Sequence, residues 1–133
     1  MRRAMTAVVG AAIVAGLAGC GSDTSSGGGG SGACSLGTSA TVTIASTGVS
    51  PKAVCVVPGS VVTFTNTDAV AHTLAPDAAT GCALLAVGPI AAGASTPVTF
   101  PAALFCTYHD AANPSATAFQ GSVSVATPGT PGY

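Results

Sequence analysis

The chain lacks most of the residues on which catalysis and charge-driven recognition depend. Its 133 residues contain no tryptophan and no glutamate, and only two histidines. Both methionines and two of the three basic residues fall within the first five positions, which leaves Lys52 against four aspartates. Such a chain offers no basic patch for nucleic acid or anionic lipid. Because paired carboxylates are scarce and no serine lies in a nucleophile motif, we expect no catalysis.

The first twenty residues have the character of an export signal. Two arginines precede an apolar run over residues 7–18 that is too short to span a bilayer comfortably. The run ends in LAGC at residues 17–20, which resembles a bacterial lipobox. The resemblance implies a lipoprotein signal peptide over residues 1–19 and a lipid on Cys20, and several acyl chains give stable anchoring. An ordinary secretory signal is the alternative. Either way, the domain is expected to be exported, and as a membrane-anchored lipoprotein it would lie on the periplasmic face or at the cell surface.

The composition divides the rest of the chain into three parts. Residues 20–33 form a polar Gly/Ser linker with nothing to bury. Residues 34–126 are long enough for one small domain with a two-layer core. Residues 127–133 form a Pro/Gly tail that we expect to be disordered.

The domain has the pattern of an all-β sandwich. Short β-branched runs alternate with turn residues, and no segment has the periodicity and caps of a helix. A Pro-Gly turn at residues 58–59 separates two of these runs. The expected strands cover residues 40–45, 53–57, 61–66, 84–87, 95–100, 104–109 and 122–126.

Two halves of the domain resemble a cupredoxin. SPKAVCVVPGSVVTFTNTDAVAHT (residues 50–73) resembles the first half, and GPIAAGASTPVTF, FCTYHD and QGSVSV resemble the second. The resemblance covers nearly all of residues 38–126. It implies a single-domain Greek-key β-sandwich of about seven to eight strands with a copper site at one pole. One-electron transfer to a redox partner protein is the function that it implies.

One alignment with the family supplies a copper site. In it, His72 is the first histidine of the family, and Cys106 and His109 are the cysteine and the second histidine. Two imidazoles and a thiolate are the ligands of a blue-copper centre. Phe119 then stands near the axial position, where the family often has methionine, and Gln120 could offer a carbonyl oxygen.

A second alignment removes most of that site. If Asp110 takes the position of the family's cysteine, the loop to Gly121 has the usual length and Asn113 replaces the second histidine. The thiolate and one imidazole are then gone. Strand alternation is a further obstacle to the first alignment, because Cys106 and His109 point to opposite faces if residues 104–109 are fully extended.

The cysteine count bears on the same question. If Cys20 is lipidated, Cys34, Cys55, Cys82 and Cys106 remain, and exported domains usually pair an even number of cysteines. Three pairings are possible. We favour Cys34–Cys55 and Cys82–Cys106, which would leave no thiolate for copper.

Three roles therefore remain open for the two histidines. They could join a blue-copper centre; His72 and His109 could bind copper or zinc as a pair, with Asp110 as an alternative ligand; or each could hydrogen-bond to loop backbone. Asp68 and Asp77 are expected to be turn formers. The functional hypotheses are copper binding with electron transfer and, alternatively, a degenerate copper-free fold stapled by two disulfides. The latter would serve as a surface structural or interaction module.

Overall fold

The computed structural model describes residues 35–80 and 82–129. The predictions for residues 1–34, namely the signal peptide, the lipidated Cys20, the linker and the cysteine at position 34, lie outside these ranges, as do the last four residues of the predicted tail. Within the described ranges, no helix has the length and apolar character needed to cross a membrane.

Strands account for most of the described chain, with two single-turn 3₁₀ helices between them. In chain order the elements are β1 (Gly37–Ala45), β2 (Gly48–Ser50), β3 (Ala53–Asn66), β4 (His72–Pro76), η1 (Ala83–Leu85), β5 (Val87–Ile90), β6 (Ser95–Phe100), β7 (Leu104–Asp110), η2 (Thr117–Phe119) and β8 (Gln120–Val125).

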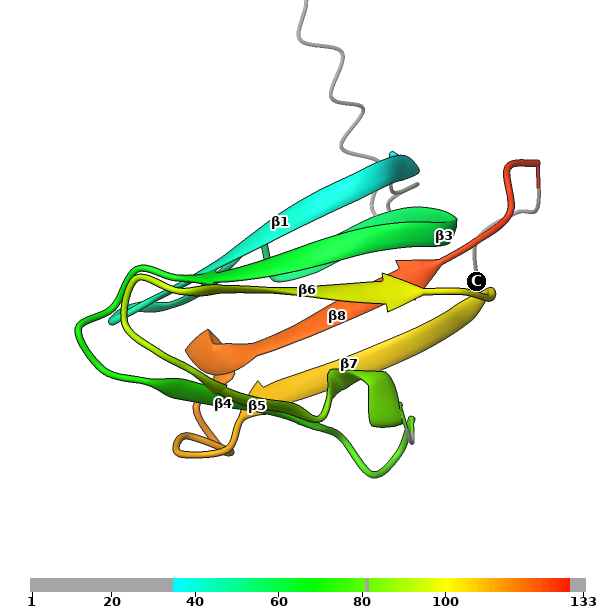
Figure 1. Cartoon of the computed structure of the whole chain (residues 1–133). Coiled ribbons are helices and arrows are strands. Elements are labelled where there is room, and N and C mark those ends of the chain that lie inside the picture. The colour runs from blue at the N-terminus through cyan, green and yellow to red at the C-terminus, as the bar shows by residue number, and fades with distance from the viewer. Residues whose placement is uncertain (1–34, 81, 130–133) are drawn as a thin grey trace, which may run out of the picture.

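The strands form two layers that share the long strand β3 (Figure 1). The first part of β3, residues 53–56, runs parallel to β8, and β7, β4 and β5 continue that layer. The later part of β3, residues 60–66, lies between parallel β1 and antiparallel β6. Neighbours in the sheet that are distant in sequence are typical of Greek-key connections. The predicted single-domain all-β sandwich is confirmed.

Alternating side chains build the core between the layers. In β3, Val62, Phe64 and Asn66 point inward and are fully buried, whereas the threonines between them are partly exposed. Such period-2 burial is what a strand with one covered face requires. The ring of Phe64 meets that of Tyr108 on β7 edge to face, with centroids 5.4 Å apart. This contact joins the two layers at the centre of the sandwich.

Two sequence predictions differ from the observed elements. The turn predicted at residues 58–59 is a bend inside one continuous β3, where Gly59 has a φ of 86°. The strand predicted over residues 84–87 is wrong, because this segment forms the η1 turn and β5 begins only at Val87. Leu85 is fully buried at the end of η1 and anchors the turn to the core. The short strands β2 and β4 were not predicted.

One glycine is required by the packing of β7 on β8. Gly121 lies directly opposite Tyr108 in the β7–β8 ladder. A Cβ atom at position 121 would lie 2.5 Å from Cζ of the Tyr108 ring, which is fully buried. Since core side chains are close-packed, the ring cannot move aside without displacing its neighbours.

We therefore expect Gly121→Ala to destabilise the domain by about 1–3 kcal/mol, the usual cost of overpacking a core. Urea unfolding of the two proteins measures this difference. Gly88→Ala is the matched control, because nothing lies within 4 Å of a Cβ built at that position, and its effect should stay within about 0.5 kcal/mol. Equal unfolding midpoints for both variants would contradict this account of the packing.

Candidate functional site

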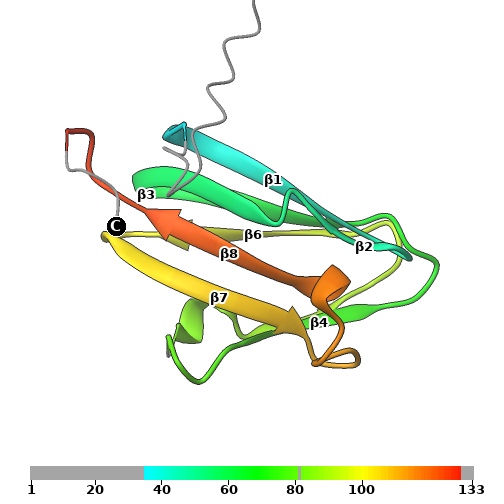
Figure 2. The ribbon, with the colours of Figure 1, turned by 180° about the vertical axis from the view of Figure 1, so that it is seen from behind.

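Three loops gather at one end of the sandwich, at the left in Figure 1 and at the right in Figure 2. They connect β3 to β4, β5 to β6, and β7 to η2. His72 begins β4 and Asp110 ends β7, so both lie at this end. We call it the loop pole.

Asn66, at the end of β3, links the β3–β4 loop to the end of β5. Its side chain is fully buried, and Nδ2 donates to the carbonyls of Val70 at 2.7 Å and Ile90 at 2.9 Å. Its Oδ1 accepts from the backbone N–H of Asp68 at 2.8 Å. These three hydrogen bonds fix the β3–β4 loop in position.

His72 lies between two carboxylates. Only 3% of this residue is exposed. Its Nδ1 is 3.2 Å from Oδ2 of Asp110, and its Nε2 is 3.1 Å from Oδ2 of Asp68. The two aspartates reach the ring from different segments, one from the end of β7 and one from the β3–β4 loop. His72 thus forms hydrogen bonds to two side chains. One of the open alternatives expected it to bond to loop backbone instead.

Asp110 is fully buried and surrounded by hydrogen-bond donors. Asn113 Nδ2 donates to its Oδ2 at 2.6 Å, and the backbone N–H of Thr73 donates to its Oδ1 at 3.4 Å. Burial raises the pKa of Asp110, but hydrogen bonds from Asn113, His72 and the backbone of Ala112 lower it, so that it lies below the ordinary value of 3.8. The carboxylate is therefore the form that this pole stabilises.

Phe119 covers one face of the His72 ring. The two rings are stacked, with centroids 5.6 Å apart and planes 23° apart. Phe119 belongs to η2, whose Thr117 carbonyl accepts a hydrogen bond from Lys52 Nζ at 2.9 Å. Gly48, at a φ of 128°, lets η2 approach β2, because a Cβ there would collide with the backbone carbonyl of Ala118. The axial position predicted for Phe119 is thus close to His72, but a phenyl ring has no donor atom for a metal.

His109 lies on the opposite face of β7, among polar side chains. It is 22% exposed, and its Nδ1 lies 2.5 Å from Oδ1 of Asp77. Hydrogen bonds from His109 and Thr107 hold the pKa of Asp77 below its ordinary value. Gln120, opposite His109 in the ladder, donates instead to the Pro114 carbonyl at 2.9 Å.

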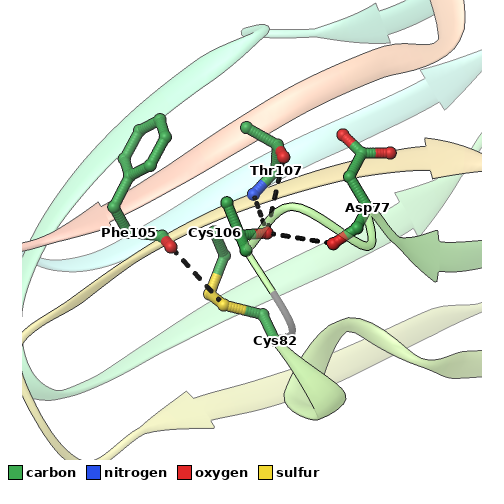
Figure 3. The surroundings of a disulfide bond; sticks show 6 residues. Asp77, Cys82, Phe105, Cys106 and Thr107 are labelled. Carbon is green, nitrogen blue, oxygen red and sulfur yellow. Dashed lines mark hydrogen bonds between the residues drawn. A yellow bond between two sulfur atoms is a disulfide. The ribbon is translucent and has the colours of Figure 1, made fainter.

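Cys106 forms a disulfide with Cys82 (Figure 3). The bond ties the β4–β5 connection to β7, with the two Cα atoms 5.6 Å apart, and confirms this predicted pairing. Cys55 is also disulfide-bonded. Its predicted partner at position 34 lies outside the described residues, so that pairing stays a prediction.

The structure does not bring His72, Cys106 and His109 together. Cys106 precedes Asp110 by four residues on an extended strand, which places it about 13 Å from the loop pole. His109 points to the other face of the same strand, which also separates it from His72 as a two-histidine site. Across the described ranges, no group of three or more His, Cys, Asp or Glu side chains is arranged to hold a metal ion.

Instead, the second alignment describes the loop pole. His72, Asp110, Asn113 and Phe119, the residues that it places at the family's ligand positions, form one contact network. Asp68 completes it and was predicted only as a turn former. As that prediction requires, its Oδ1 accepts from the Ala69 N–H at 2.6 Å. The contact between its Oδ2 and His72 was not predicted, and the only signal for it in the sequence is the four-residue spacing of the two residues.

Comparisons with known proteins identify the fold. No protein-family model and no curated protein sequence matches the chain. Among solved structures it is similar to a purple cupredoxin from Nitrosopumilus maritimus, with 23% identity and a TM-score of 0.57 over 65% of this chain and 99% of that one. A variant of amicyanin in the Cu(I) form has 22% identity and a TM-score of 0.53 over 69% of this chain and 86% of that one.

A third similar structure is the Cu-containing nitrite reductase NirK from Thermus scotoductus SA-01. It has 19% identity and a TM-score of 0.59, and the match covers 67% of this chain but 22% of that enzyme. The protein therefore has the cupredoxin-like fold, as its sequence resemblance implied.

The donor set of the loop pole does not fit a blue-copper ion. Such a centre takes two imidazoles and a thiolate. Here the pole offers one imidazole, the Asp110 carboxylate, the Asn113 amide and the phenyl ring of Phe119. The nearest sulfur on β7, that of Cys106, is bonded to Cys82.

Removal of the Cys82–Cys106 disulfide should lower the free energy of unfolding by about 2–4 kcal/mol, because the bond closes a loop with a sequence separation of 24. The variant Cys82→Ser/Cys106→Ala isolates this bond from that of Cys55, which a reducing agent would also break. Urea unfolding measures the loss. An unchanged midpoint would show that the bond adds no stability.

Asp110→Asn should destabilise the domain by about 1–3 kcal/mol, because buried donors lose their acceptor. Since the folded pKa of Asp110 lies below its unfolded value, its contribution is present above about pH 4 and is lost as pH falls through the folded value. Unfolding curves from pH 7 to pH 2 should therefore fall less steeply in the variant. Asp77→Asn is the control, since Asp77 is half-exposed. A loss as large in that variant would contradict a special role for Asp110.

Proposed function

We propose that this protein is an exported, lipid-anchored domain of cupredoxin-like fold that acts as a structural or interaction module of the cell envelope. The observation that carries the proposal is the carboxylate of Asp110, which meets His72 at the pole where a copper ion would need a thiolate. The polar side chains of this pole hydrogen-bond to one another. The sulfur of Cys106, which copper would require as a thiolate, is bonded to Cys82.

The sequence supports the membrane attachment. The lipobox-like residues 17–20 and the Gly/Ser-rich residues 20–33 would hold the folded domain off the membrane through lipid on Cys20. Disulfide bonding of Cys82 and Cys106 agrees with an oxidising compartment outside the cytoplasm.

The surface of the loop pole suits contact with an uncharged partner. Val70 is 58% exposed at its tip, and Ala69 and Ala71 are exposed on either side of it. No lysine or arginine other than Lys52 occurs in the described domain, so a partner would not be steered by strong charge.

Copper binding with one-electron transfer is the second candidate function. The observation that favours it is the fold likeness to cupredoxins, together with a histidine at the loop pole. It would require a redox partner protein and a set of ligands other than His72, Cys106 and His109 together. Of these three, only His72 lies inside the loop pole, whereas Cys106 is bonded to Cys82 and His109 lies on the opposite face of β7.

A copper titration separates the two candidates. We expect the exported protein, with Cys20→Ser for solubility, to retain no copper after desalting and to show no intense blue or purple thiolate-to-copper absorption. Elemental analysis and the visible spectrum are the measurements. One copper per chain that is lost in His72→Gln but kept in His109→Gln would overturn the proposal and establish the second candidate.

A further inference from the structure

The surroundings of His72 constrain how many protons its ring carries. Each ring nitrogen lies at hydrogen-bond distance from a carboxylate oxygen, at 3.2 Å for Asp110 and 3.1 Å for Asp68. A neutral imidazole has one N–H donor and one bare nitrogen, whereas an imidazolium has two donors. A bare nitrogen that faces an ionised carboxylate would place two acceptors against each other.

The carboxylates themselves are the only other source of a proton in this contact. Asp110 is an unsuitable source, because donors from Asn113, Thr73 and Ala112 already surround it and favour its ionised form. The Oδ1 of Asp68 accepts from the backbone N–H of Ala69 at 2.6 Å, and its Oδ2 faces the ring as a second acceptor. Two acceptors therefore face one ring, and two N–H groups satisfy both.

The face of the ring provides a third, independent contact. The Phe119 ring stacks on His72 with centroids 5.6 Å apart, within the distance at which an aromatic face attracts a cation. The ring is thus enclosed by two anions in its plane and by a π face above it. Each of these contacts is more favourable for an imidazolium than for a neutral imidazole.

We propose that His72 is a buried imidazolium that bridges Asp68 and Asp110, and that this bridge closes the loop pole in place of a bound metal ion. It joins two parts of the chain that are separate in sequence, namely the β3–β4 loop with the start of β4, and the end of β7. The charges of the bridge sum to −1. The one lysine of the domain, Lys52, donates to the Thr117 carbonyl and does not enter the bridge.

The bridge also explains why the pole would exclude metal ions. A metal ligand must present a lone pair, and both ring nitrogens of His72 are used as donors. His109 differs, because its Nδ1 faces a single carboxylate and needs one N–H only. The two histidines of this chain therefore provide an internal comparison in one molecule.

Nitrogen-15 NMR of the metal-free protein at pH 7.5 tests the proposal directly. Long-range proton–nitrogen correlations distinguish a ring with two N–H groups, whose nitrogen shifts are similar, from a ring with one, whose shifts are widely separated. We expect two N–H groups on His72. A single N–H on that ring in the wild-type protein would overturn the proposal.

Asp68→Asn supplies the matched variant, because the side chain of Asp68 is 15% exposed whereas that of Asp110 is fully buried, and its amide replacement can either accept or donate. In this variant the His72 ring should lose one N–H at the same pH and its nitrogen shifts should separate. Asp77→Asn should change the His109 signals and leave those of His72 in place. Unchanged His72 signals in Asp68→Asn would also overturn the bridge. Because no copper is added, this result is independent of the copper titration.

Discussion

The alternation of side chains along β7 is the constraint on which the rest of the structure depends. Cys106, Tyr108 and Asp110 face inward, and each makes a different contact: a disulfide to Cys82, a close fit over Gly121 and a hydrogen bond to the His72 ring. The residues between them, including His109, face outward. Because a strand has a period of two, Cys106 and His109 cannot serve one metal ion while β7 remains extended.

The few charges of the domain are used locally. Each described aspartate lies within hydrogen-bond distance of a histidine: Asp68 and Asp110 beside His72, and Asp77 beside His109. Buried charges are costly unless they are paired and hydrogen-bonded, and Asp110 meets both conditions. The loop pole thus combines a fixed, charged interior with an uncharged, alanine-rich exterior.

The parts of the fold that the sequence predicted well are those governed by local pattern. Alternating β-branched residues predicted most strands, and the even cysteine count predicted disulfides, of which the favoured Cys82–Cys106 pairing is observed. The failures arose where tertiary contacts override local pattern. Residues 84–87 are apolar enough for a strand but form a 3₁₀ turn beside Cys82, and the bonds of Asp68 and Asp77 to histidines depend on partners that loops and strands bring near.

The sequence by itself determined an all-β domain of cupredoxin-like fold and the residue types at its pole, because hydrophobic period, turn residues and motif order are written along the chain. It left two alignments of the ligand positions open. Only the tertiary structure decided between them, since the face on which a side chain lies depends on where β7 ends and what it pairs with. With Asp110 at the end of β7, a carboxylate meets the imidazole of His72, and the sulfur of Cys106 lies four residues deeper, bonded to Cys82.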